Sequence, residues 1–239
     1  MGGRRRAARE AVSGASIAGL SACAAAHLDC YTQQDSMYAF YSYDRMGSPD
    51  VISPTDCLAP VLLNVRMSYA HVLPLFHSAG PGANLLSCMR QVLETDSEQL
   101  IDFIELDLHD PDGPWQVVDR AISTSGAVKH LKAVAVTKML HRKRPSFVPI
   151  FDREIYRFYF GYYPMRGSYA AEPRSLWPVL QADLRLNRSW LTELIRGRET
   201  PDGRELSLLR AADIVVWMHM VTGCGRAVAT NDSPELTTL

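Results

Sequence analysis

The sequence predicts an all-α protein of roughly nine helices, packed as one domain or as two closely associated helical lobes. Three observations support this fold class. Apolar residues recur at helical spacing along most of the chain, clear helix starts and breaks divide it, and no alternating strand pattern of any length occurs. The two β-like segments, residues 37–43 and 147–151, are short. With 47% hydrophobic residues among 239, the chain can bury a core of ordinary size.

Local start and stop signals place the first helices. Ser53, Pro54 and Asp56 supply an N-cap, a proline in the first turn and an early acid, which predict a helix running to about Asn64. The Gly-Pro-Gly run at 80–82 breaks the chain before a helix at 85–93. Apolar spacing and breaking residues place the remaining helices before the central segment at 68–76, 97–108 and 114–122. A stripe of carboxylates marks one face of this region as solvated: Glu94, Glu98, Asp102 and Glu105.

The central and C-terminal helices follow the same logic. Pro145 ends a helix that carries Val136, Met139 and Leu140, and basic residues at its C-terminus oppose the helix dipole. Asp152 is placed to cap the next, tyrosine-rich helix. Long apolar patterns then predict helices at 175–196 and 206–221, with a turn at 200–203 between them.

We expect residues 1–36 to be a weakly ordered or helical extension, 37–225 a single globular domain, and 226–239 a disordered tail. No segment approaches the length of a membrane span. The expected location is the cytoplasm, with an exported lipoprotein as an alternative, because an arginine run at 4–6 precedes a small-residue stretch ending at Cys23. The sequence does not indicate an oligomeric state.

The charge and the cysteine content limit the classes of function and the kinds of site that the chain can have. The net charge is −1, with 25 basic and 26 acidic residues, so any contact with nucleic acid would need a local basic patch. The five cysteines are odd in number and lack a CxxC pair, which argues against a zinc site and against a disulfide framework. Nucleotide-triphosphate, nicotinamide and serine-hydrolase motifs are missing from the sequence. We therefore expect no metal and no cofactor.

Residues 131–152, LKAVAVTKMLHRKRPSFVPIFD, are the most informative segment. The run TKMLHRKRPSFVPIFD resembles the signature of an uncharacterised family of actinobacterial proteins, in which a K-x-L-x-R-K-R-P block precedes a proline-flanked apolar stretch and an aspartate. Two further blocks resemble the same family, SPTDCLAPVLLN at 53–64 and SLLRAADIVVWMH at 207–219. The resemblance covers roughly residues 40–222 and implies no particular reaction.

The same segment is remotely similar to the helix-hairpin-helix DNA glycosylases, which place a hairpin, a helix and an apolar crossing before a catalytic aspartate. Leu131 takes the first apolar position of the hairpin, residues 132–135 fall at its turn without the family's glycines, and Asp152 takes the place of the aspartate. Val134 or a neighbouring apolar residue stands near the position of the lysine nucleophile in bifunctional members. The similarity therefore implies a helix-hairpin-helix glycosylase-like fold and a monofunctional, water-using hydrolase.

Two groups of residues are candidates for substrate binding around Asp152. Lys138 and Arg142 share a helix face at i,i+4 spacing and, with Lys143 and Arg144, could hold a phosphate; the alternative is a charge cluster that only caps the helix dipole. Tyr156, Tyr159 and Tyr163 could stack on a flipped base or a planar metabolite; the alternative is that these rings fill the core.

Three functions remain open. The first is a metal-independent glycosylase-like enzyme that cleaves an N-glycosidic bond in DNA or a nucleoside, with Asp152 as the catalytic carboxylate. The second is a non-catalytic protein that binds nucleic acid or another anion through Lys138 and the run 142–144. The third is a small-molecule enzyme of specialised metabolism whose pocket contains Asp152 and the tyrosines. A broad positive groove around Asp152 would favour the first, a local positive patch the second, and an enclosed, near-neutral aromatic cavity the third.

Overall fold

The computed structural model describes residues 15–129, 131–165 and 171–224, and this part of the chain is all-helical, as predicted. Its β structure is limited to one isolated bridge between Glu199 and Glu205. The predicted tail at 226–239 lies outside the described residues. The α-helices are α1 Ser21–Thr32, α2 Phe40–Tyr43, α3 Pro54–Leu58, α4 Tyr69–Val72, α5 Pro81–Thr95, α6 Trp115–Ser125, α7 Ala133–Lys143, α8 Arg153–Phe160, α9 Ala171–Ile195 and α10 Leu208–Thr222. Four 3-10 helices join them: η1 Ile17–Leu20, η2 Ala59–Leu63, η3 Leu73–Phe76 and η4 Phe103–Glu105.

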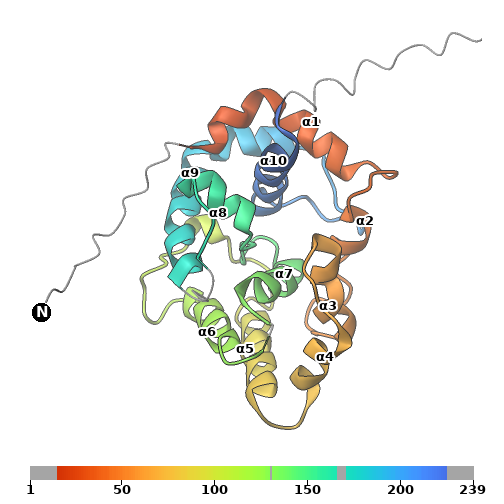
Figure 1. The fold of residues 1–239 in the computed structure, drawn as a ribbon. Coiled ribbons are helices and arrows are strands. Elements are labelled where there is room, and N and C mark those ends of the chain that lie inside the picture. Colours follow the sequence, from red (N-terminus) through yellow and green to blue (C-terminus); the bar gives the residue numbers. More distant parts are fainter. Residues whose placement is uncertain (1–14, 130, 166–170, 225–239) are drawn as a thin grey trace, which may run out of the picture.

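Helix α10 and helix α7 organise two sides of the molecule (Figure 1). Helices α1, α8 and α9 pack against α10, whereas α5, α6 and η2 pack against α7. A continuous apolar core joins the two sides, with an edge-to-face group of rings from Trp115, Phe147, Phe151 and Trp177 near its middle. None of the helices in the described ranges is long and apolar enough to cross a membrane.

The N-terminal boundary differs from the expected one. Residues 15–32 were expected to lie in an extension, yet η1 and α1 bury Ile17, Leu20, Ala24 and Leu28 in the same core as the rest of the fold. The buried face of α1 includes Cys23, Ala24 and the polar His27, whereas other alanines lie on the exposed face, so the two faces differ little in hydrophobicity. The amphipathic signal that would have revealed this helix as a core element is therefore weak.

The predicted helix at 97–108 is wrong. Only Phe103–Glu105 is helical there, and Leu100 is 77% exposed. The Asp96 and Asp102 side chains instead accept hydrogen bonds from the backbone N–H groups of Ile101 and Ile104. Aspartate offers the backbone this local alternative to helical bonding, and the left-handed φ of 57° at Gln99 breaks the helix.

Helices α6 and α7 are consecutive and pack against each other, but the turn between them precedes the predicted position. Residues 132–135, expected at a hairpin turn, are the N-cap and first turn of α7. The Lys132 ammonium donates to the carbonyls of Gly126 and Val128 at 3.0 and 2.9 Å, where α6 ends. A lysine thus satisfies carbonyls that a helix C-terminus leaves without partners.

The basic residues of α7 are buried rather than exposed at a helix end. Lys143 Nζ donates to the carbonyls of Met46 and Ser48 at 2.8 Å each, and it pairs with Asp56 at 2.8 Å. Burial favours a higher pKa for Asp56, but hydrogen bonds from Lys143 and Ser53 outweigh it and lower that pKa. The Arg144 guanidinium, only 1% exposed, donates to the carbonyls of Pro49 and Leu93 at 2.9 Å each. These cations bind the preceding chain to α7.

The cysteines also differ from expectation. Cys23 of α1 and Cys224 beyond α10 form a disulfide across 201 residues, whereas Cys30, Cys57 and Cys88 are free. The lipoprotein alternative needs a Cys23 sulfur available for acylation. In the structure, Cys23 is 1% exposed inside α1 and its sulfur is bonded to Cys224.

We expect Arg144→Ala to lower the free energy of unfolding by about 3–5 kcal/mol, because it leaves buried carbonyls and Asp96 without their cation. Denaturant titration of the purified chain measures this. Arg196→Ala is the matched control, since Arg196 pairs with Glu193 while 73% exposed, and it should cost less than about 0.5 kcal/mol. Equal losses in the two variants would contradict a structural role for Arg144.

Candidate functional site in a pocket between α1, α7 and α10

The position of Asp152 follows from the way the chain returns along α7. After Pro145, the apolar crossing 147–151 runs back beside this helix. His141 Nδ1 donates to the carbonyl of Val148 at 2.7 Å, and Phe151 N donates to Thr137 Oγ1 at 3.0 Å. Burial lowers the pKa of His141 to about 3, so this imidazole is neutral. The crossing ends where Asp152 meets Lys138, one turn before His141.

Asp152 has two roles in the structure. Its Oδ1 accepts a hydrogen bond from Glu154 N at 2.9 Å and caps α8, as predicted. Its Oδ2 accepts a hydrogen bond from Lys138 Nζ at 2.8 Å, and this ammonium also donates to the carbonyl of Leu63 at 3.0 Å. The Asp152 side chain is 13% exposed and the Lys138 side chain 5%. The carboxylate is therefore more than a helix cap.

Asp152 and Lys138 lie at the wall of a pocket of about 80 Å³. Helix α10 contributes the other charged residues, Arg210 and Asp213, and residues after α1 and along η2 complete the wall. The charged lining consists of two cations and two carboxylates, so the pocket is close to electrically balanced. The remaining lining residues are Tyr31, Met37, Tyr38, Ala39, Leu62, Leu63, Asn64, Ile214 and Trp217.

Asp213 is the second carboxyl group of the pocket. Burial raises the pKa of Asp213 to about 6; Arg210 opposes this rise, and the neighbouring Asp152 carboxylate adds to it. Asp213 Oδ2 accepts a hydrogen bond from Arg210 Nη1 at 2.5 Å. The pocket thus contains one carboxylate paired with a lysine and another that carries a proton in mildly acidic solution.

Arg210 is held in place from several sides. It donates to both carboxylate oxygens of Asp44 at 2.8 Å, and it lies over the rings of Tyr31 and Tyr43, with its guanidinium carbon 5.2 and 5.0 Å from their centroids. Only 2% of the residue is exposed. A planar guanidinium with this many fixed partners orients Asp213 rigidly.

Aromatic rings form one side of the pocket. The rings of Tyr31 and Tyr38 stack at 5.0 Å between centroids, and Trp217 meets Tyr38 edge-on at 5.8 Å. Trp217 is half-buried and lines the pocket. Because Tyr38 and Trp217 are only half-buried, the uncovered parts of their rings offer an apolar surface to a planar ligand.

The predicted tyrosines do not line this pocket. Tyr156 stacks on Phe160 at 4.4 Å and is 2% exposed, and Tyr159 donates to Asp183 Oδ2 at 2.9 Å while 1% exposed. Tyr163 is exposed and lies beside Arg153 and Arg157, whose guanidinium carbons are 5.0 and 4.9 Å from its ring centroid. Tyr156 and Tyr159 therefore fill the core, which was the alternative to a role in stacking on a ligand.

Among the predicted basic residues, the structure brings only Lys138 to Asp152. Arg142 donates to Asp56 and to the carbonyl of Tyr43, and the donors of Lys143 and Arg144 meet the chain's own oxygens in the contacts described above. These donors are engaged within the fold. They do not form the open positive patch that an anion-binding track would require.

Sequence reasoning missed Asp213, Arg210, Tyr31 and Tyr38 as pocket residues. A signal for the first two was present, because a charged pair at i,i+3 within the otherwise apolar run 208–218 must find partners in the core. For Tyr31 and Tyr38 the sequence offers no comparable signal, since the segment containing them lay at the expected domain boundary.

Comparison with known proteins identifies a family whose function is unknown. Residues 24–220 match the model of a family of unknown function, DUF6308. This range includes all three sequence blocks that suggested an uncharacterised family. No curated protein and no solved structure matches the chain.

The raised pKa of Asp213 predicts a pH-dependent stability difference. The unfolded carboxyl has a pKa of about 3.9, so the folded chain holds this proton more tightly. The resulting stabilisation is complete below about pH 4 and is lost as the pH rises to about 6, by at most about 3 kcal/mol. Asp213→Asn removes the titration. We therefore expect the Tm of the variant to rise relative to that of the wild type as the pH increases from 4 to 8. A Tm difference that does not change with pH would contradict the raised pKa of Asp213.

Proposed function

We propose that this chain, which belongs to the DUF6308 family, is an enzyme that hydrolyses the N-glycosidic bond of a small nucleoside-like molecule in the pocket between α1, α7 and α10. The observation that carries this proposal is the presence of two carboxyl groups in different surroundings in one pocket. Asp152 pairs with Lys138, whereas burial raises the pKa of Asp213 to about 6. When different environments separate the pKa values of two carboxyl groups in one site, one group can act as a base and the other as an acid.

The proposal gives each carboxyl a distinct role. Asp152, paired with Lys138, is the carboxylate that stabilises positive charge developing on the sugar and accepts the proton of the attacking water as a general base. Asp213, with its pKa near 6, is the acid that gives a proton to the departing base. Arg210 holds Asp213 in position, and Lys138 holds Asp152.

The dimensions and charge of the pocket favour a small molecule over DNA. About 80 Å³ accommodates one end of a small ligand, and the balanced charges around it supply no track for a phosphate backbone. The half-buried rings of Tyr38 and Trp217 offer a surface on which a planar base can stack, whereas the Tyr31 ring is covered by Tyr38 and Arg210. The balanced charge also disfavours the anion-binding alternative, because the two carboxylates offset the attraction of Lys138 and Arg210 for an anion.

The direct test is release of a free base from a panel of ribo- and deoxynucleosides, followed by chromatography. We expect Asp152→Asn and Asp213→Asn each to lower kcat/KM by at least about 100-fold, because each removes one of the proposed catalytic carboxyls. Asn caps a helix about as well as Asp, so the first variant removes the charge while keeping the α8 cap.

Glu98→Gln is the control for a lost carboxylate, since Glu98 is exposed and lies outside the pocket lining. Oligonucleotides containing damaged bases are assayed in parallel. Release from DNA alone would overturn the small-molecule part of the proposal. No release from any substrate, or release that survives Asp152→Asn in a folded variant, would overturn the proposed reaction.

The acid role of Asp213 fixes the direction of the pH profile. Asp213 must be protonated to act, so kcat/KM should fall as the pH rises through about 6, and the residual activity of Asp213→Asn should lack this decline. Steady-state rates measured from pH 5 to 9 decide this. A wild-type rate that rises across that range would assign the acid role to another group.

A further inference from the structure

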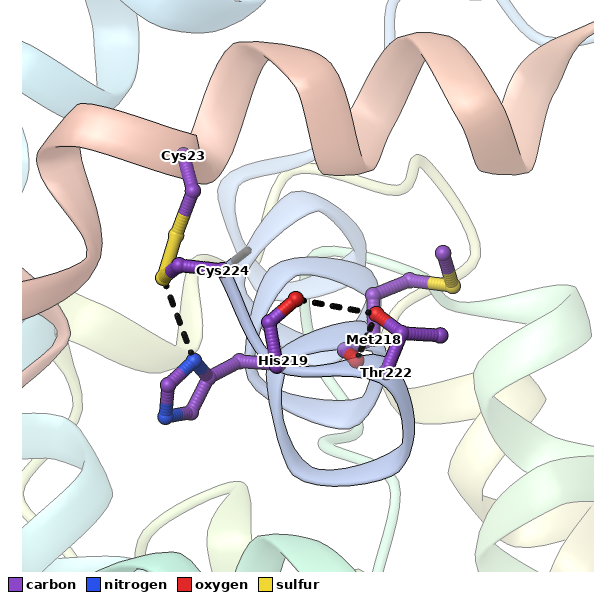
Figure 2. The surroundings of a disulfide bond; sticks show 6 residues. Cys23, Met218, His219, Thr222 and Cys224 are labelled. Carbon is purple, nitrogen blue, oxygen red and sulfur yellow. Dashed lines mark hydrogen bonds between the residues drawn. A yellow bond between two sulfur atoms is a disulfide. The ribbon is translucent and has the colours of Figure 1, made fainter. Parts of the chain in front are cut away.

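A second cluster of chemically reactive side chains lies where α1 crosses α10, apart from the pocket. Cys23 and His27 stand one turn apart on α1, and His219 and Cys224 come from the last turn of α10 and the residues after it. One donor atom from each of the four lies within 4.8 Å of the others. Figure 2 shows Cys224 beside the His219 ring, whose Nδ1 is 3.4 Å from the Cys224 sulfur.

Local geometry brings these residues together. Residues four apart share a helix face, so Cys23 and His27 both point toward α10. Helix α10 ends at Thr222, and Gly223, with a φ of 69°, redirects the chain so that Cys224 meets α1. The His27 and His219 rings meet edge-on, 6.3 Å between centroids.

The surroundings of His27 indicate that a ligand binds at this junction. The residue is 0% exposed, and neither ring nitrogen has a hydrogen-bond partner among the described residues. Buried imidazole nitrogens are normally satisfied, because leaving water without a replacement partner costs free energy. A disulfide between Cys23 and Cys224 accounts for the two sulfurs, but it gives the His27 nitrogens no partner.

The donor set suits a particular class of ion. Two thiolates and two imidazoles form the Cys₂His₂ set of structural zinc sites, which are closed and tetrahedral. Thiolate and imidazole ligands select zinc over the hard cations Mg²⁺ and Ca²⁺, which prefer oxygen. With all four ligands supplied by side chains, such a site stabilises a fold rather than catalysing a reaction.

We propose that the reduced chain binds one Zn²⁺ ion through Cys23, His27, His219 and Cys224, joining α1 to α10. The disulfide and the zinc site are then alternative states of the same sulfurs, since zinc requires both as thiolates. The proposal does not depend on the glycosidase activity. Nevertheless, α1 and α10 also carry Tyr31 and Trp217, so zinc would fix two walls of the pocket relative to each other.

The test uses the full chain, reduced with a phosphine and freed of metal by a chelator under anaerobic conditions. Titration with Co²⁺ should give the intense visible bands of a tetrahedral ion and a thiolate charge-transfer band, saturating at one ion per chain. Zn²⁺ should then displace Co²⁺ and raise the Tm of the reduced chain. The spectrum comes from the unaltered protein, so this arm does not depend on whether a variant folds. A reduced chain that shows neither spectral feature would overturn the proposal.

Variants identify the ligands. His27→Asn and the double change Cys23→Ser with Cys224→Ser should each weaken Zn²⁺ binding by at least about 100-fold, because changes merely beside a metal ligand already cost up to that much. Cys88→Ser is the matched control, as Cys88 is free and lies outside the cluster, and it should bind Zn²⁺ like the wild type. A folded His27→Asn chain that binds Zn²⁺ with wild-type affinity would show that His27 is not a ligand. Equal binding in the double serine variant and the wild type would overturn the site altogether.

Discussion

The burial of cationic side chains along α7 is the constraint on which the rest of the fold depends. A lysine or arginine removed from water needs fixed oxygen partners, and here most of those partners are backbone carbonyls of residues 43–63. The irregular segment between α2 and η2 is thereby fixed along one helix. The same requirement places Asp152, because Lys138 bridges its carboxylate and the Leu63 carbonyl.

The parts of the fold that sequence reasoning predicted are those fixed by neighbouring residues. Ser53 and Asp56 form a reciprocal capping box at α3, Asp152 caps α8, and Pro145 follows the end of α7 directly. The failures have a different origin. In 97–108, apolar spacing favoured a helix while aspartate side chains bonded to nearby N–H groups, and the second effect prevailed. Helix α1 was undervalued because alanine carries little information about which face is buried.

The candidate site likewise contains residues that the sequence predicted and residues that it did not. Asp152 and Lys138 lie 14 residues apart on connected elements, so a local reading of one segment could place them together. Their partners on α10 and near α1 approach them only through tertiary packing, which no single segment encodes. The basic run shows the converse error. Its residue types suit phosphate, yet the fold uses Lys143 and Arg144 for its own carbonyls, and a sequence motif alone does not separate these two uses.

The pocket is built from residues near both ends of the sequence, with Tyr31 on α1 and Trp217 on α10. On the ribosome, α1 is synthesised well before α10, the helix that covers it. Until then the buried faces of η1 and α1, with Ile17, Leu20 and Leu28, have no permanent partner and are exposed to chaperones and to other nascent chains. Completion of α10 is therefore the event that both closes the core and creates the pocket.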